Sequence, residues 1–220
     1  MMLICLHGCG GTPADWGRFP GHVAPTMEIH CLQGDISVNG GYTFFAKRAD
    51  GGLDPEEMAS RADRLVTDIA ALQRCASDQA HIGRGNSLNC RMSSSSNRAR
   101  SSRHAAGCSP APPLLMGYSS GATIAAAVLQ RHPAAIAGAV LLRPQPPFLD
   151  PPCLALSGLP VLVLAGRHDT RRTPDAAETL ALQLRSAGAE VELHLLNTGH
   201  GWDPTGRDGA LAKAWFNRFG

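Results

Sequence analysis

Short runs of apolar residues alternate with longer segments of mixed polarity along most of the chain. This alternation is typical of strands that crossover helices join into a mostly parallel sheet. The apolar runs predict strands at 2–6, 27–32, 114–118, 138–142, 161–165 and 191–196. The mixed segments predict helices at 13–23, 55–74, 120–131, 174–187 and 207–219. We therefore expect an α/β fold with a mostly parallel central sheet of about six strands, flanked by helices, and no large cap domain.

Three of the predicted helices begin with capping signals. Each has a threonine or an aspartate at the N-cap position, then a proline at the first helical position and an acidic residue in the first turn. The N-cap residues are Thr12, Asp54 and Thr173. An N-cap side chain satisfies a free backbone N–H, and proline lacks the N–H that would otherwise be unpaired there. These signals predict helix starts at residues 13, 55 and 174.

One segment, residues 77–111, interrupts the periodic pattern within a chain of 220 residues that otherwise fits a single domain. It contains a run of four serines and five arginines against one acidic residue, Asp78, and so carries a net charge of +4. A disordered surface insertion is the expected interpretation. Alternatives are a functional basic loop that binds an acidic partner and a stretch translated in a shifted reading frame.

Composition narrows the class of protein. The formal charge of +2 and the 17% of charged residues give no general signature of nucleic-acid binding. No run of about 18 apolar residues could span a membrane, and the N-terminus lacks a basic leader, so we expect a cytoplasmic protein. Seven cysteines without a C-x-x-C pair predict reduced thiols and no metal centre. A homodimer is an option that the sequence leaves open.

The strongest chemical motif is Gly117-Tyr118-Ser119-Ser120-Gly121. It lies between a predicted buried strand and a predicted helix, which is the context in which G-x-S-x-G marks a nucleophilic serine at a sharp turn. Small residues are needed on both sides so that the strand and the helix can approach closely. Centring the motif on Ser120 would put a tyrosine where glycine is required, so Ser119 is the predicted nucleophile.

A serine nucleophile needs a base, which an acid must orient. His200, between two glycines directly after the last predicted strand, is the predicted base. Asp169 follows a buried-looking strand and lies between Ser119 and His200 in the chain, which is the expected order. The competing acids are Asp150, in a proline-rich loop, and Asp175 and Glu178, in the first turn of a predicted helix.

A tetrahedral intermediate also needs N–H donors for its oxyanion. The glycine-rich turn His7-Gly8-Cys9-Gly10-Gly11 follows the first strand, so the backbone amides of Cys9 and Ser120 are the predicted pair. The predicted loops also contain four large aromatic residues, which could line an acyl or aryl pocket or could cap the core: Phe44, Phe45, Phe148 and Trp202.

With these motifs in place, the chain resembles the phospholipase/carboxylesterase branch of the α/β-hydrolase superfamily, including dienelactone-hydrolase-like bacterial proteins. The resemblance rests on five segments: residues 7–11, residues 44–48 together with the predicted helix that follows them, residues 117–121, residues 165–169 and residues 199–201. It implies an α/β-hydrolase fold, a triad of Ser119, Asp169 and His200, and an oxyanion hole at Cys9 and Ser120. The segment 77–111 has no obvious counterpart in the family, and two arginines, Arg171 and Arg172, stand where many relatives are less charged.

The sequence therefore predicts a serine hydrolase that cleaves small or short-chain carboxylic esters, with thioesters as further candidates, through an acyl-enzyme and without a metal or organic cofactor. The expected partner is a small-molecule ester. The alternative is a non-catalytic binding protein with the same fold, or a product disabled by the irregular segment.

Overall fold

The computed structural model describes residues 1–81, 111–152 and 154–220. Its centre is a six-stranded sheet in the order β2-β1-β5-β6-β7-β8, and every neighbouring pair is parallel. The strands are β1 (Met2–Leu6), β2 (Glu28–Leu32), β5 (Leu114–Tyr118), β6 (Gly138–Leu142), β7 (Pro160–Gly166) and β8 (Glu190–Leu196). The predicted parallel α/β fold is confirmed, because all six predicted strands form within a residue of their expected ends.

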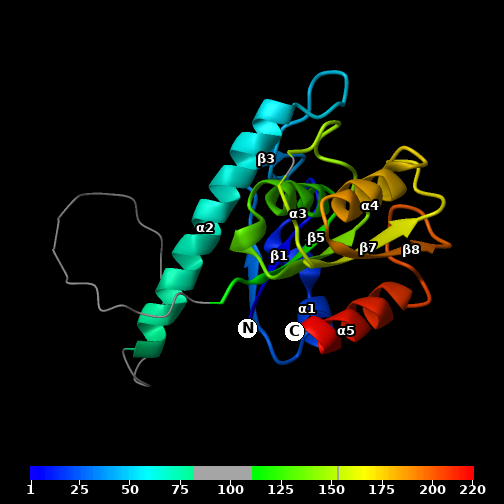
Figure 1. Ribbon diagram of the computed structural model, residues 1–220. Helices are drawn as coiled ribbons and strands as arrows, with labels where there is room; N and C mark the ends of the chain where they lie inside the picture. Colours follow the sequence, from blue (N-terminus) through cyan, green and yellow to red (C-terminus); the bar gives the residue numbers. More distant parts are fainter. Residues whose placement is uncertain (82–110, 153) are drawn as a thin grey trace.

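Helices cover both faces of this sheet (Figure 1). The helices are α1 (Phe19–Val23), α2 (Pro55–His81), α3 (Ser120–Arg131), α4 (Ala176–Ser186) and α5 (Arg207–Phe219), with short 3₁₀ turns at Pro13–Trp16 and Pro133–Ala135. Buried residues of α2, α3 and α4 pack together with one set of strand side chains, whereas α1 and α5 contribute to a second cluster with the other set. Two separate apolar cores therefore hold a three-layer fold together.

The central strands are buried on both faces, which explains why they read as continuous apolar runs. The long helix α2 instead buries one stripe, in which Met58, Ala62, Leu65 and Ile69 recur at helical spacing. Its start agrees with the capping prediction, because the Asp54 carboxylate accepts a hydrogen bond from the Glu56 N–H.

The prediction of one helix over 13–23 is wrong. A 3₁₀ turn over Pro13–Trp16 ends at Gly17, whose φ of 50° cannot continue a right-handed helix, and α1 begins only at Phe19. The predicted cap residue, Thr12, is nevertheless the N-cap of the 3₁₀ turn and pairs with the Asp15 carboxylate. The predicted start of α4 is also two residues early, because Pro174 and Asp175 form a turn before the helix.

The predicted irregular segment begins too early. Helix α2 continues to His81, so residues 77–81 are helical rather than irregular. Residues 82–110 lie outside the described residues, so the three interpretations of the segment stay open, as does the single-domain prediction.

A two-stranded antiparallel hairpin that the apolar pattern did not predict follows β2. Its strands, β3 (Ile36–Val38) and β4 (Gly41–Thr43), have only three residues each, which is too short for a clear alternation. The turn between them uses Asn39 and Gly40, both with positive φ, as two-residue hairpins require.

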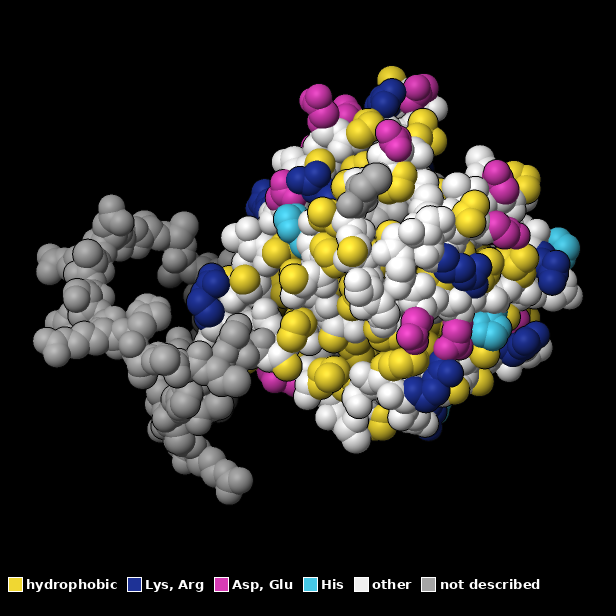
Figure 2. Space-filling model, viewed as in Figure 1, with side chains coloured by type: hydrophobic (Ala, Val, Ile, Leu, Met, Phe, Trp, Pro, Cys, Tyr) yellow, Lys and Arg dark blue, Asp and Glu magenta, His cyan; other side chains and the backbone are white. Residues whose placement is uncertain are grey.

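On the face shown in Figure 2, basic and acidic side chains are interspersed and hydrophobic side chains are scattered among them. Within the described ranges, no helix has the length and apolar character needed to cross a membrane.

Candidate active site

The candidate catalytic residues lie at one edge of the sheet, where parallel strands have their carboxyl ends. Ser119 follows β5, Asp169 follows β7 and His200 follows β8, and the glycine-rich turn that starts at His7 follows β1. Because parallel strands all end at the same edge, residues far apart in the chain meet there.

The turn at Ser119 has the strained geometry that a nucleophile elbow requires. Ser119 has φ 55° and ψ −110°, which a residue with a Cβ rarely adopts. A Cβ on Gly121 would lie 2.0 Å from the Leu6 carbonyl oxygen, and one on Gly117 would lie 2.4 Å from the Gly121 backbone. The expectation that the flanking residues must be small is confirmed, since the backbones of strand and helix touch there.

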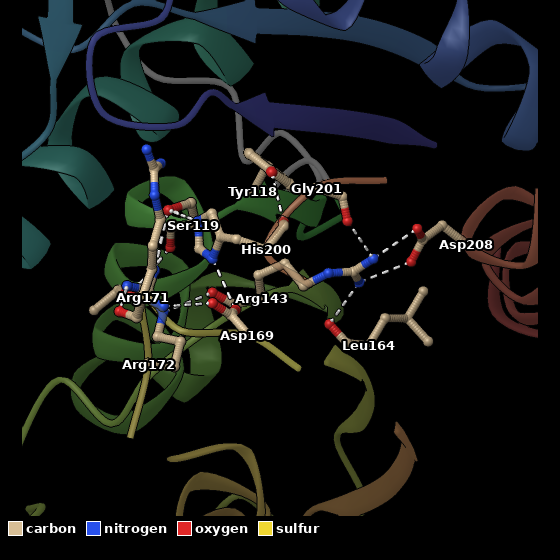
Figure 3. A network of polar contacts seen from close by, with 11 residues as sticks. Tyr118, Ser119, Arg143, Leu164, Asp169, Arg171, Arg172, His200, Gly201 and Asp208 are labelled. Carbon is tan, nitrogen blue, oxygen red and sulfur yellow. Dashed lines mark hydrogen bonds and ion pairs between the residues drawn. The ribbon is translucent and has the colours of Figure 1, made fainter. Parts of the chain in front are cut away.

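Ser119, His200 and Asp169 form a continuous chain of hydrogen bonds (Figure 3). His200 Nδ1 lies 2.7 Å from Asp169 Oδ2, and His200 Nε2 lies 2.8 Å from Ser119 Oγ. A carboxylate can only accept, so Nδ1 carries the proton and Nε2 is free to accept the serine proton. None of the competing acids contacts His200 in the part of the chain that the structure describes; Asp175 is the N-cap residue of α4.

The environment of the His200 imidazole favours its neutral form. Burial lowers the pKa of His200, and the nearby guanidinium groups of Arg172 and Arg171 lower it further, while the hydrogen bond to Asp169 opposes the shift. A neutral imidazole is the form that can take a proton from the serine hydroxyl.

Contacts from neighbouring elements fix the loop that carries His200. The Tyr118 hydroxyl donates to the His200 carbonyl at 2.7 Å, and the Arg143 guanidinium donates to the Gly201 carbonyl at 2.9 Å. The end of β7 also passes very close to this loop, because a Cβ on Gly166 would lie 2.2 Å from the Gly199 carbonyl oxygen. The acid and base segments are thus held against each other by backbone contact.

The glycine-rich turn after β1 lies against the elbow. A Cβ on Gly8 would lie 3.0 Å from the Tyr118 ring and 3.6 Å from the Ser119 Cβ. His7 holds the turn from inside: its Nδ1–H donates to the Gly8 carbonyl and its Nε2 accepts the Gly34 N–H. The imidazole is fixed by these two bonds and lies 4.8 Å from the Phe44 ring.

The hairpin that sequence reasoning missed supports this turn from the other side. The Gly10 N–H donates to the Tyr42 carbonyl, and the Tyr42 N–H donates to the Gly11 carbonyl. Among the described residues, the amides of Cys9 and Ser120 have no backbone or side-chain acceptor; Ser120 belongs to the elbow, and Cys9 belongs to the glycine-rich turn that packs against it. They are therefore free to donate to a bound group.

A cavity of about 220 Å³ adjoins the elbow and is lined by the glycine-rich turn together with Asp15, Trp16, Tyr118 and Trp202. Of the four aromatic residues considered as pocket residues, only Trp202 lines it; Trp202 is 43% exposed and stacks on Tyr118. Phe44, Phe45 and Phe148 are buried in the core, which agrees with the alternative interpretation that these residues cap the core.

Sequence reasoning noted Arg172 only as a charge that many relatives lack, and it did not place this side chain at the nucleophile. In the structure its Nη2 donates to Ser119 Oγ at 3.0 Å (Figure 3). The only signal was the pair of arginines in the loop after Asp169. Across the described ranges, no group of three or more His, Cys, Asp or Glu side chains is placed to hold a metal ion.

No protein-family model matches the sequence. In sequence, the chain is 26% identical over 218 residues to MhqD of Bacillus subtilis, which is described as a hydrolase by inference. The match covers 98% of this chain and 92% of MhqD. The crystal structure of a Bacillus cereus carboxylesterase superposes with a TM-score of 0.77 at 26% identity and covers 100% of this chain and 88% of its own. A carboxylesterase from Mesorhizobium loti superposes with a TM-score of 0.73 at 21% identity, and the match covers 98% of this chain and 88% of the esterase. The chain therefore has an α/β-hydrolase fold and is similar, in sequence and in structure, to hydrolases that include carboxylesterases.

Proposed function

We propose that the protein hydrolyses small carboxylic esters through an acyl-enzyme on Ser119. The observation that carries this proposal is the hydrogen-bonded chain from Ser119 through His200 to Asp169 at the edge of the sheet. A serine hydroxyl is a weak nucleophile, and a neutral imidazole at 2.8 Å is what makes it reactive.

In the first half of the reaction, His200 Nε2 takes the Ser119 proton while Oγ attacks the ester carbonyl carbon. The amides of Cys9 and Ser120 would donate to the resulting oxyanion, and the Ser120 amide also lies at the positive end of α3. Asp169 stabilises the imidazolium that forms. The imidazolium then protonates the departing alcohol, and the acyl group remains on Ser119.

In the second half, His200 deprotonates a water molecule, which attacks the acyl-enzyme. The tetrahedral intermediate collapses, the proton returns to Ser119 Oγ, and the carboxylic acid leaves. These steps use only groups of this chain, so they require no metal or organic cofactor. A thioester would follow the same steps with a thiol as the leaving group.

The cavity beside the elbow supports a small substrate. Its volume of about 220 Å³ is below the range of pockets for drug-sized ligands. The Tyr118 and Trp202 rings stack at 5.3 Å between centroids on its wall, so a short acyl chain or a single ring would find an apolar surface there.

Two experiments test the proposal. A fluorophosphonate probe should label the wild-type protein on Ser119, and the wild type should hydrolyse 4-nitrophenyl acetate and the corresponding thioester. Ser119→Ala should lose labelling and turnover while its thermal unfolding stays close to that of the wild type. Ser120→Ala is the matched control, because its hydroxyl is not the proposed nucleophile and its amide remains. A folded wild type that neither reacts with the probe nor hydrolyses either substrate would contradict the proposal and favour a non-catalytic binding protein.

A further inference from the structure

The guanidinium group of Arg172 lies directly beside the proposed nucleophile (Figure 3). Besides its bond to Ser119 Oγ, its Nε donates to the Arg143 carbonyl at 3.0 Å and its Nη1 donates to the Arg171 carbonyl at 3.2 Å. Two backbone carbonyls thus hold the group in place. A guanidinium carries five N–H bonds, so one N–H remains on each terminal nitrogen.

The Arg172 guanidinium forms no direct ion pair among the described residues, although the charge of Asp169 is close enough to oppose the lowering of its pKa. Among the described residues, no carboxylate lies within ion-pair distance of it, whereas Arg61, Arg131 and Arg143 each contact an aspartate. Asp169, which is the nearby acid, already accepts hydrogen bonds from His200 and from the Arg171 N–H. Burial lowers the pKa of Arg172, which means that its cation is poorly solvated.

The other charged side chains around this point are of both signs. Arg167 and Arg171 lie on the same loop as Arg172 and are exposed. Glu178 lines a common groove with Arg172, and among the described residues no ion pair joins the two. A cation that is held firmly, partly desolvated and unpaired next to the reacting atom suits a ligand anion, and the planar fork of arginine matches a carboxylate in particular.

We propose that Arg172 binds a carboxylate of the substrate, so that the preferred substrates are half-esters of short dicarboxylic acids. This inference rests on the proposed ester hydrolysis at Ser119. The 3.0 Å contact between Arg172 and Ser119 Oγ requires the carboxylate to lie only a few bonds from the ester carbonyl. A neutral ester would bring no anion to the Arg172 guanidinium, whereas a half-ester would bring a carboxylate.

The test compares two esters of nearly equal shape, monomethyl succinate and methyl succinamate, in which a neutral amide replaces the carboxylate. We expect the wild-type kcat/KM to be about tenfold or more higher for the carboxylate, which is the usual effect of one charge-assisted hydrogen bond. Arg172→Gln should bring the ratio of the two kcat/KM values close to one, and Arg172→Lys should retain part of it. Arg167→Gln removes the same charge from an exposed position on the same loop and should keep the wild-type ratio.

Each other outcome overturns the inference. If the wild-type kcat/KM values for the two esters are nearly equal, Arg172 does not select the carboxylate. If Arg172→Gln still prefers monomethyl succinate, another group binds the carboxylate. If Arg172→Gln slows both esters by the same factor, Arg172 acts on the serine or on the oxyanion and does not bind the substrate. Failure of the proposed function is distinguishable, because neither ester would then turn over and the fluorophosphonate probe would not label Ser119.

Discussion

Arg143 and Asp208 form a bidentate ion pair in the interior, with each terminal guanidinium nitrogen 2.8 Å from a different carboxylate oxygen. Both side chains are almost completely buried. Arg143 follows β6 with a φ of 54°, and the same guanidinium donates to the carbonyls of Leu164 and Gly201. The pair therefore connects helix α5 with the loop that carries His200, as Figure 3 shows.

Replacing Asp208 with Asn should leave the buried Arg143 charge uncompensated. We expect the free energy of unfolding to fall by about 3–5 kcal/mol, as is usual when one partner of a buried pair is removed. Urea denaturation followed by circular dichroism measures this. Glu192→Gln, which breaks the exposed pair with Arg218, should cost about 1 kcal/mol or less. Equal losses in the two variants would contradict the structural role of the buried pair.

Adding a methyl group at Gly121 should force the elbow apart, because the new Cβ would lie 2.0 Å from the Leu6 carbonyl oxygen. We expect Gly121→Ala to lower stability by about 2 kcal/mol or more and to lower esterase activity. Gly21→Ala, in α1, is the control, since nothing lies within 4 Å of its Cβ position, and it should be neutral or slightly stabilising. A fully active and stable Gly121→Ala protein would rule out the tight approach of β1 and α3.

Asp169→Asn should lower kcat by about 10³- to 10⁴-fold, because an amide in place of the carboxylate favours the wrong histidine tautomer and does not stabilise the imidazolium. Steady-state kinetics on a chromogenic ester, together with the rate of fluorophosphonate labelling, would show the loss. Asp175→Asn, at one of the competing acids, should leave both rates within a few-fold of the wild type. The assignment of Asp169 fails if the two variants behave alike.

The rate should rise with pH as His200 loses its proton, since only the neutral imidazole can act as the base. Burial lowers the pKa of His200, so the midpoint of the kcat/KM profile should fall below the ordinary value of about 6.5, with activity lost as the pH is lowered through it. Arg172 also lowers this pKa, so Arg172→Gln should move the midpoint upward when a neutral ester is used. A wild-type midpoint above the ordinary value, or a downward shift in the variant, would contradict this electrostatic picture.

Much of the scaffold was predictable because its signals are local. The strands Met2–Leu6, Leu114–Tyr118 and Gly138–Leu142 are buried on both faces, so each stands out as a continuous apolar run. The glycines around Ser119 are likewise a local signal, whereas Asp169 and His200 were predicted from their order in the chain and from their places after predicted strands. The break at Gly17 and the three-residue strands of the β3–β4 hairpin were missed, because a single backbone angle or a very short strand leaves no periodic pattern.

The amino-acid sequence by itself determined the α/β architecture, the elbow at Ser119 and the partners Asp169 and His200, since these depend on apolar periodicity, glycine placement and chain order. Only the tertiary structure decided that Phe44, Phe45 and Phe148 are core residues, that Trp202 lines the cavity, and that the Arg172 guanidinium reaches Ser119. These are contacts between residues far apart in the chain. Their distances depend on how the loops after β1, β5, β6, β7 and β8 pack against one another at the edge of the sheet, and no local pattern encodes that packing.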